Sequence, residues 1–307
     1  MILNWGLSRK RDTLAARAGI IRNIRFFFHE GGYLEVETPL RIPAPAPESQ
    51  IDAIPADNWF LQTSPEICMK RLMAAGCQRL FQICHCWREG ERGRLHHPEF
   101  TMLEWYRRGA DYLDLMEECE ELIRSLAHGN GLANALQFRG TRIDLTGRWE
   151  RITVRNAFER FGGMAMKEAL SFGLFDEIMV ERIEPQLGIS RPTFIYDYPA
   201  ERSALARLRP DDPAVAERFE LYIGGIELAN AFTELTDTAE QRDRFVRETA
   251  LRRDLGKRPY PLPEKFLVEL ADMPQAAGIA LGIDRLIMVL LDKGSIDDVV
   301  AFTPEDL

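Results

Sequence analysis

The sequence has no apolar stretch long enough to cross a membrane and no secretory signal pattern at its amino end. A membrane-spanning helix needs about 18 or more consecutive apolar residues, and charged or polar residues interrupt every apolar run here well before that length. We therefore expect a cytoplasmic protein with no membrane partner.

An excess of positive charge is also missing. Lys and Arg total 39 against 48 Asp and Glu, which gives a net charge of −9. Binding to nucleic acid without sequence preference depends on neutralising phosphates, so this charge balance argues against it. A local basic pocket for a small phosphate ligand remains compatible. With 307 residues, 46% of them hydrophobic and 28% charged, the chain has the composition of a soluble globular protein of one large or two ordinary domains.

Cysteine is scarce, and its number is odd. The five cysteines all lie in the first 120 residues, which favours reduced thiols over a disulfide framework. Cys84 and Cys86, followed by His96 and His97, raise the possibility of a zinc site. Cysteines at i and i+2 on a strand share a face, but structural zinc sites usually place two to four residues between them. Buried thiols on a sheet are therefore the preferred interpretation.

The most informative stretch runs from Phe81 to Tyr106. It starts with alternating apolar residues, passes through a charged turn with two glycines, and returns through a second apolar run. This pattern predicts two strands joined by a long loop. The loop carries Arg88, Arg92, Arg94, His96 and His97. Such a loop either surrounds an anionic ligand or forms a solvated hairpin tip, and its sequence alone leaves both open.

The rest of the chain predicts strands in hairpins with helices at their flanks. Gly31 and Gly32 can end the first helix, and prolines 43, 45 and 47 indicate an extended loop. The expected helices are 13–30, 65–75, 112–127, 238–256 and 286–291. The expected further strands are 33–38, 59–62, 137–144, 193–198, 216–223, 226–235 and 278–285, the last of them ending in Arg285. The absence of a βαβ rhythm indicates the α+β class.

Two glutamates in the expected strand 226–235 attract attention. Glu227 and Glu234 are seven positions apart, so strict alternation would place them on opposite faces. A bulge at Asn230–Ala231 would bring them to one side.

Three stretches together resemble a known family. Residues of about 20–39, 81–106 and 278–291 look like motifs 1, 2 and 3 of the class II aminoacyl-tRNA synthetases, most closely the catalytic domain of lysyl-tRNA synthetase. The runs 64–66, 96–106 and 227–237 add specificity, and the resemblance covers the chain from about residue 13 onward. It implies one α+β catalytic domain over residues 1–307, with an antiparallel sheet flanked by helices, and a homodimer.

The chain differs from lysyl-tRNA synthetases in two ways, and both differences indicate a more specific group within the family. Only about a dozen residues precede the motif 1 helix, too few for the OB-fold anticodon-binding domain of lysyl-tRNA synthetases. The chain is thus similar to truncated paralogues that activate (R)-β-lysine with ATP and transfer it to a lysine side chain of elongation factor P, and tRNA is not expected as a partner. Ala280 stands where motif 3 usually has glycine, which in those paralogues accompanies preference for the β-amino acid.

The resemblance also implies a nucleotide site. Arg88 would bridge the substrate carboxylate and the α-phosphate, Arg285 would hold the γ-phosphate, and Glu227 would bind Mg²⁺, with Glu234 as a second candidate ligand. The implied ATP contacts are Arg88, Glu89, Gly90, His97, Glu227, Leu228, Gly282 and Arg285. Motif 2 usually begins Arg-x-Glu, so either Glu89 or Glu91 could take the adenine side, and that role stays open.

A diamine substrate needs carboxylates at both ends of its pocket. By resemblance, Glu66 and Glu104 would receive the amine near the carboxylate, and Tyr106 and Glu234 the ε-amine. The remaining implied substrate contacts are Ser64, Pro65, Asn230, Phe232 and Ala280.

Two alternatives compete with this hypothesis. A lysine-activating enzyme could serve tRNA or another acceptor, or a synthetase-like module could bind without catalysis. Retention of Arg88, Glu227, Glu234 and Arg285 argues against the non-catalytic module. Arg92 and Arg94 receive no role from the sequence.

Overall fold

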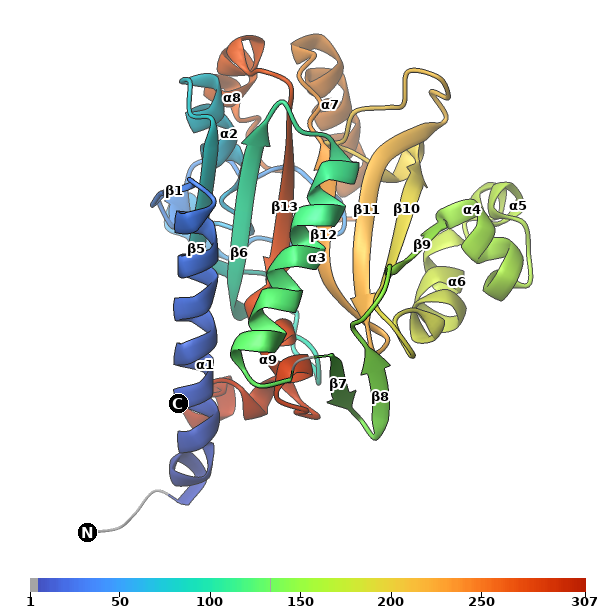
Figure 1. Ribbon diagram of the computed structural model, residues 1–307. Coiled ribbons are helices and arrows are strands. Elements are labelled where there is room, and N and C mark those ends of the chain that lie inside the picture. Colours follow the sequence, from blue (N-terminus) through green and yellow to red (C-terminus); the bar gives the residue numbers. More distant parts are fainter. Residues whose placement is uncertain (1–4, 133) are drawn as a thin grey trace.

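A mostly antiparallel sheet of eight strands forms the centre of the protein (Figure 1). The computed structural model describes residues 5–132 and 134–307. In spatial order the strands are β1 (Leu34–Glu35), β5 (Arg79–Trp87), β6 (Glu99–Arg108), β13 (Ala276–Gly282), β12 (Ile226–Thr233), β11 (Val215–Ile223), β10 (Thr193–Pro199) and β9 (Glu150–Thr153). Only the edge pairs β1–β5 and β10–β9 are parallel. The expected α+β architecture is confirmed.

Three helices cover one face of the sheet: α1 (Trp5–Glu30), α3 (Tyr112–Gly129) and α9 (Ile283–Leu290) (Figure 1). The main apolar core lies between them and the sheet. Phe28 of α1 stacks on Phe81 of β5 with ring centroids 4.8 Å apart, and it lies 5.1 Å from the ring of Trp105 in β6. This packing leaves the opposite face of the sheet for the site.

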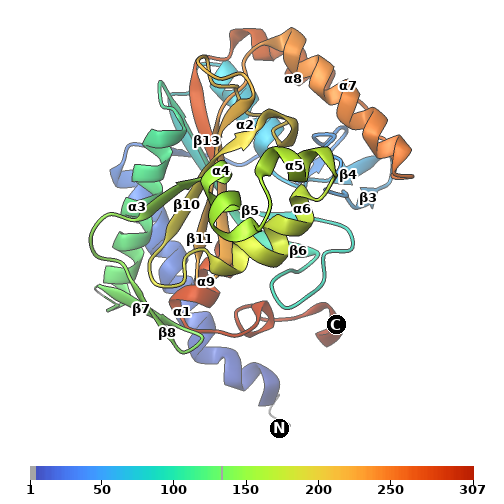
Figure 2. The same ribbon diagram turned by 90° about the vertical axis from the view of Figure 1, so that its right-hand side faces the viewer.

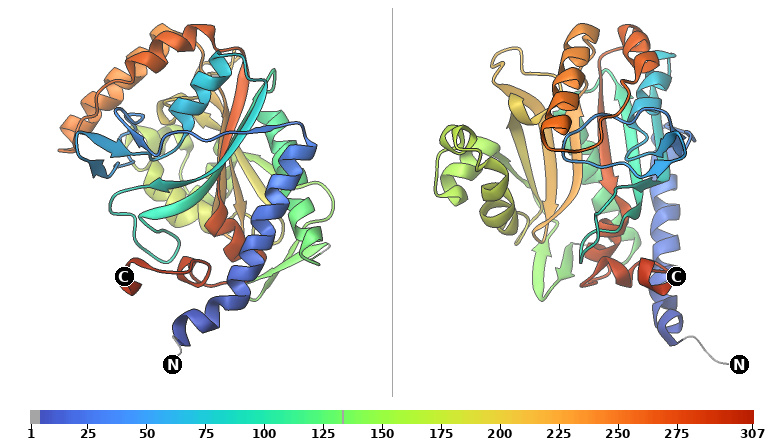
Figure 3. Two further views of the ribbon diagram at one scale, coloured as in Figure 1. Left: turned by 90° about the vertical axis from the view of Figure 1, so that its left-hand side faces the viewer. Right: turned by 180° about the vertical axis from the view of Figure 1, so that it is seen from behind.

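The opposite face is covered less completely. Helices α2 (Glu66–Ala74), α7 (Thr238–Asp254) and α8 (Glu264–Glu269) lie over it, beside a small sheet of β2 (Arg41–Ile42), β4 (Trp59–Leu61) and β3 (Pro55–Ala56) (Figure 3). The proline-containing loop that crosses this face is fixed by the buried Arg252 of α7. Its guanidinium donates hydrogen bonds of 2.7 Å to the carbonyls of Glu48 and Ile51. The loop therefore forms a fixed rim around the site.

The helical segment between β9 and β10 lies beside the β9 edge of the sheet. A hairpin of β7 (Ala135–Phe138) and β8 (Thr141–Asp144) leads to a helical segment with α4 (Val154–Ala157), α5 (Met166–Ser171) and α6 (Phe175–Ile178) (Figure 2). Shorter turns are π-helical at Phe158–Gly162 and Met179–Ile183, and 3-10 helical at Glu184–Gln186, Ala200–Arg202, Leu270–Asp272, Ile296–Asp298 and Pro304–Asp306. Among the described residues no helix combines the length and apolarity needed to cross a membrane.

The predicted elements are mostly confirmed, with four differences. The first helix starts at Trp5 rather than 13, strand 33–38 keeps only Leu34–Glu35, strand 137–144 is a hairpin, and the last helix starts at Ile283. The chain turns at Arg139 and Gly140, both with positive φ, and this reversal splits the predicted strand in two. The earlier start of α9 places Arg285 in its first turn instead of at a strand end.

Candidate active site

Strand register gathers the predicted substrate residues into rows across the open face of the sheet. Ala280 of β13 pairs with Glu104 on one side and with Asn230 on the other. Asn230 in turn pairs with Glu220 of β11. Because paired residues share a face, these four side chains form one row.

A second row lies two residues further along the strands. Gly278 of β13 pairs with Tyr106 and with Phe232, and Phe232 pairs with Arg218. The two rows bring together five of the site residues predicted from sequence, although these come from β6, β12 and β13, which are far apart in the chain.

A cavity of about 480 Å³ opens over these rows. Its walls include most of the predicted nucleotide residues and three of the predicted substrate residues: Arg88, His97, Glu227, Leu228, Gly282 and Arg285, with Asn230, Phe232 and Ala280. Glu89 and Gly90 do not line the cavity, so the prediction that they contact the nucleotide is not supported by their position. Ser64, Pro65, Glu66, Glu104, Tyr106 and Glu234 lie outside the cavity wall.

A bulge in β12 brings Glu227 and Glu234 to the same face, as expected, but at a different place. Leu221 pairs with Ala229 and Tyr222 pairs with Glu227, so Leu228 is the extra residue. The predicted position of the bulge at Asn230–Ala231 was wrong. At about 3.3 Å per residue the two glutamates are roughly 20 Å apart, too far to share one metal ion.

Glu220 is a cavity residue that the sequence interpretation missed. Its carboxylate accepts hydrogen bonds from Tyr198 Oη at 2.6 Å, Tyr222 Oη at 2.9 Å and Arg218 Nη2 at 2.6 Å. Burial raises the pKa of Glu220, which Arg218 opposes and the nearby charge of Glu227 reinforces. Alternation along strand 216–223 could have indicated it, because its neighbours Phe219 and Leu221 face the other side.

Glu104 is buried below the cavity and held by two hydroxyl groups. Ser64 Oγ donates to its Oε2 at 2.6 Å, and Tyr106 Oη donates to its Oε1 at 2.6 Å. Burial, with repulsion from Glu66, raises the pKa of Glu104 to about 7. This arrangement connects four predicted substrate residues into one polar cluster.

Lys70 joins two further predicted carboxylates. Its ammonium Nζ lies 2.5 Å from Glu66 Oε1 and 2.5 Å from Glu234 Oε2, and its side chain is fully buried. The contact with Glu234 has the distance of an ion pair but not the angles of a hydrogen bond, and neither oxygen of Glu234 has a hydrogen-bond partner among the described residues. Burial raises the pKa of Glu234 to about 8, against the attraction of Lys70. Sequence reasoning missed Lys70, although it lies four residues after Glu66 on a predicted helix.

The guanidinium of Arg88 lies at the cavity wall over the ring of Phe100, 5.1 Å from its centroid. Its Nη1 is 3.9 Å from Glu91 Oε1, and its buried Nε has no hydrogen-bond partner among the described residues. Glu91 lines the cavity whereas Glu89 does not, so position favours Glu91 for the role that the sequence left open.

Arg285 also lines the cavity, from the first turn of α9. Its Nη1 donates to the carbonyl of Glu227 at 2.9 Å and lies 3.2 Å from Glu227 Oε2, and its Nε donates to the carbonyl of Leu95 at 3.2 Å. The guanidinium also contacts the ring of His96. Burial and the charge of Arg285 lower the pKa of His96, which favours a neutral ring beside this guanidinium.

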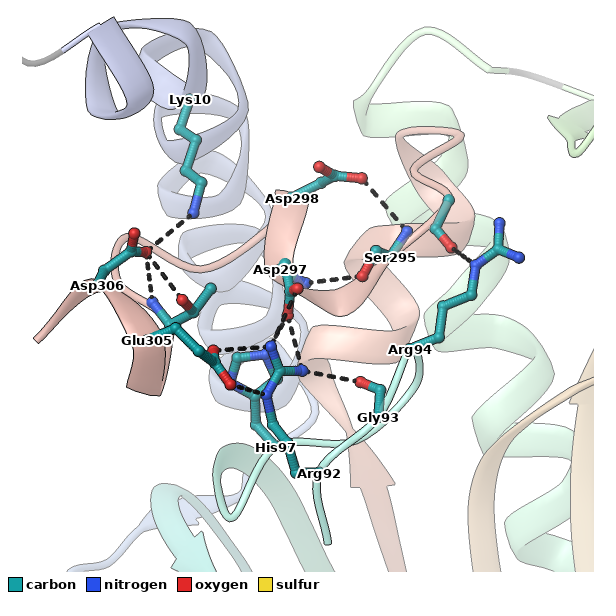
Figure 4. Close-up of polar contacts among 12 residues, drawn as sticks. Lys10, Arg92, Gly93, Arg94, His97, Ser295, Asp297, Asp298, Glu305 and Asp306 are labelled. Carbon is teal, nitrogen blue, oxygen red and sulfur yellow. Dashed lines mark hydrogen bonds and ion pairs between the residues drawn. The ribbon is translucent and has the colours of Figure 1, made fainter.

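The rest of the Arg-rich loop docks on the carboxy-terminal segment (Figure 4). Arg92 contacts Glu305 Oε2 at 2.9 Å and Asp297 Oδ1 at 3.1 Å, and His97 Nε2 lies 2.6 Å from the same Asp297 oxygen. Arg94 Nε donates to the carbonyl of Gly294 at 2.9 Å. The loop is thus not a free hairpin tip, and much of its positive charge is neutralised within the chain.

The zinc hypothesis gains no support from the structure. Cys84 and Cys86 pack against Met102 in a small buried cluster, with their sulfurs 3.9 Å apart. His85 points elsewhere, with Nδ1 3.0 Å from Glu99 Oε1. Within residues 5–132 and 134–307, no group of three or more His, Cys, Asp or Glu side chains is arranged to hold a metal ion.

Comparison with known proteins agrees with this geometry. The sequence pattern of the family described as tRNA synthetases class II (D, K and N) matches residues 2–306. The chain is 40% identical to a Proteus mirabilis protein over 98% of both chains, and 38% identical to one from Erwinia tasmaniensis over 98% of this chain and 97% of that one. A Salmonella gallinarum protein is 39% identical over 97% of each chain. All three relatives are named elongation factor P–(R)-β-lysine ligase. The chain therefore belongs to the class II tRNA synthetase family of the D, K and N group.

Proposed function

We propose that this protein is an ATP-dependent ligase that activates (R)-β-lysine as an adenylate and transfers it to a lysine side chain of elongation factor P. One observation carries the proposal: the cavity has guanidinium groups at its nucleotide end and a buried cluster of carboxylates below its other end. The names of the full-length relatives supply the β-lysine and the acceptor. ATP and elongation factor P both occur in the cytoplasm, where we expect the reaction.

The nucleotide end provides the charge that this chemistry needs. A substrate carboxylate oxygen attacks the α-phosphorus, and the bond to pyrophosphate breaks. Both reactants are anions, so catalysis depends on alignment and on offsetting their charge. Arg88 would contact the carboxylate and the α-phosphate, because its partly unpartnered, planar guanidinium suits bidentate binding. Arg285 would hold the γ-phosphate, with Glu91 on the adenine side.

Mg²⁺ fits the donor groups present at the cavity wall. Mg²⁺ typically uses one or two carboxylates together with substrate phosphates and water. Glu227 and Glu220 both line the cavity and are near enough for the charge of Glu227 to act on Glu220. They would hold the ion, which supplies further positive charge at the phosphates. Glu234 would instead bind an amine.

The carboxylate cluster would bind the two ammonium groups of the amino acid. Glu66 and Glu104 would take the amine near the reacting carboxylate, and Glu234 with Tyr106 the ε-amine. Glu234 supports this role, because its two buried oxygens lack a hydrogen-bond donor among the described residues and its charge is offset only by the ion pair with Lys70, which Glu66 shares. In the second step the acceptor amine attacks the acyl carbon, AMP leaves, and an amide forms.

We also propose a homodimer. Phe26, Leu34 and Leu40 lie at the end of α1 and just after it, and their side chains are 66%, 57% and 45% exposed. Large exposed apolar residues in one region often mark a protein interface. Light scattering would test this, and a monomer at micromolar concentration would contradict it.

Pyrophosphate exchange tests the activation step. We expect ATP–pyrophosphate exchange that depends on a lysine isomer, with (R)-β-lysine preferred to α-lysine, and then a mass increase of one lysyl residue on elongation factor P. Absence of exchange with every lysine isomer would overturn the proposal. If the amino acid were transferred to tRNA instead, the proposed activation step would stand, but tRNA rather than elongation factor P would be the acceptor.

A further inference from the structure

The ammonium of Lys70 lies between two of the carboxylates that would bind the substrate amines. With 2.5 Å to Glu66 Oε1 and 2.5 Å to Glu234 Oε2, these two oxygens are at most 2.5 + 2.5 = 5.0 Å apart. Two ionised carboxylates this close in a buried site repel strongly. The ammonium of Lys70 offsets this repulsion and lets the two carboxylates lie close together.

The third neighbour of Lys70 is also a substrate residue. Its Nζ lies 5.0 Å from the centroid of the Phe232 ring, and Phe232 lines the cavity. All three contacts of the ammonium thus belong to residues that would bind the amino acid. Burial alone would lower the pKa of Lys70, but the attraction of Glu234 and Glu66 outweighs it and raises that pKa, so the side chain carries its charge at neutral pH.

A charge count for the fully ionised cluster shows the consequence for the ligand. When the three buried carboxylates (Glu66, Glu104 and Glu234) are all ionised they contribute −3, and Lys70 contributes +1, which leaves −3 + 1 = −2. A lysine isomer brings two ammonium groups and makes the cluster neutral. Without Lys70, the same ligand would leave one buried carboxylate uncompensated, and that group would take up a proton or repel the others.

We propose that Lys70 is a positioning residue that fixes Glu66 and Glu234 in place and sets the pocket to accept two ammonium groups. The inference rests on the proposed function and deepens it. Lys70 does not touch the substrate in this arrangement. It acts through the two carboxylates and the aromatic wall that do.

The decisive variant is Lys70→Met, which keeps a long side chain but removes the charge. We expect its KM for the lysine isomer in pyrophosphate exchange to rise by about a hundredfold, while the KM for ATP changes little. The KM for the amino acid should fall again as pH rises from about 7 to about 9, because the carboxylates then lose the extra proton.

The matched control is Arg71→Met on the same helix. Arg71 Nε lies 2.6 Å from Glu269 Oε2, and neither residue lines the cavity. The variant therefore also loses one cation and one ion pair of α2. Its KM values and pH profile should follow those of the unsubstituted protein.

Chemical rescue separates a charge role from simple packing. In Lys70→Ala, we expect added propylammonium ions to restore exchange at least about tenfold by entering the space that the side chain leaves, and 1-propanol to have no such effect. If Lys70→Met does not fold, this second variant and its thermal unfolding with and without the amine still decide the matter.

The outcomes are distinct. An unsubstituted protein that activates no lysine isomer would overturn the proposed function and this inference together. An active unsubstituted protein with an unchanged lysine KM in Lys70→Met would overturn only the inference. Equal rescue by propylammonium and propanol, or an equal rise of both KM values without pH dependence, would also overturn it.

Discussion

The ring of Tyr106 lies so close to Gly278 that a Cβ atom there would come within 2.3 Å of Tyr106 Cε1. The same atom would lie 2.5 Å from Glu234 Oε1. Tyr106 and Glu234, both proposed to bind the substrate, therefore leave no room for a side chain at position 278.

Gly278→Ala should disrupt the amine end of the pocket. The methyl group forces Tyr106 or Glu234 to shift, and overpacking of this kind costs about 1–3 kcal/mol. We expect the KM for the lysine isomer to rise roughly ten- to hundredfold, with a smaller effect on the KM for ATP. Gly19→Ala in α1 is the control, since a Cβ there meets only Arg22 Nη2 at 3.9 Å. An unchanged amino-acid KM would contradict the pocket assigned here.

Ala280→Gly should move preference toward α-lysine. Ala280 lies between Glu104 and Asn230 in register, so in the proposed pocket its methyl group would displace the part of the substrate next to the reacting carboxylate. One methyl group in a tight pocket is worth roughly 1–3 kcal/mol of discrimination. The ratio of kcat/KM for the two isomers measures this, and a ratio equal to that of the unsubstituted protein would remove the role of Ala280.

Arg88→Lys should lose most activity even though it keeps the charge. Lysine cannot contact two anions in a planar, bidentate manner, so we expect the exchange rate to fall about a hundredfold or more. Arg94→Lys in the same loop is the matched control, because Arg94 donates to Gly294 outside the cavity. Similar losses in both variants would indicate an effect on the loop rather than on the reaction.

Glu227→Gln and Glu234→Gln should have different defects. We expect Glu227→Gln to raise the Mg²⁺ concentration for half-maximal exchange by about tenfold or more, with little change in lysine KM. Glu234→Gln should instead raise the lysine KM roughly ten- to hundredfold and leave the Mg²⁺ dependence unchanged. Titration of both substrates for each variant decides this. If both variants needed more Mg²⁺ for half-maximal exchange, Glu227 and Glu234 would both be metal ligands, and the separate roles proposed for them would be wrong.

Protonation of the carboxylate cluster should make substrate binding depend on pH. Burial raises the pKa of Glu104 to about 7 and that of Glu234 to about 8. The folded protein then binds more protons than the unfolded chain above about pH 4.5, so these groups make the free energy of unfolding decrease as pH rises toward about 8. Ammonium groups of the ligand favour the ionised carboxylates and should offset this loss.

Thermal unfolding with and without saturating lysine isomer gives the measurement. The increase in Tm caused by the ligand should grow between about pH 6 and about pH 8, because fewer protons must then be released on binding. In Glu104→Gln, the ligand-induced increase in Tm should no longer change with pH near pH 7, because the group that titrates there is missing. A ligand-induced shift that is the same at every pH would contradict the assigned cluster.

Local sequence patterns determined the elements and the general position of the site. Alternating apolar residues define β5, β6, β11 and β12, and paired glycines end α1 and join the hairpin at 224–225, because these preferences belong to the backbone of a few neighbouring residues. The ordered motifs predict Arg88, Glu104 and Asn230 at one site, and strand register brings Glu104 and Asn230 to one face of the sheet.

Only the tertiary structure decided which charges meet. The bulge at Leu228 places Glu227 beside Arg285, the carboxy-terminal segment neutralises Arg92, and Lys70 joins Glu66 to Glu234. Each of these depends on how elements distant in the chain pack against one another, and a pattern within one element does not contain that information. A buried ammonium and a buried carboxylate are tolerated only as partners, and this pair forms only once α2 packs against β6 and brings Lys70 to Glu234, just after β12.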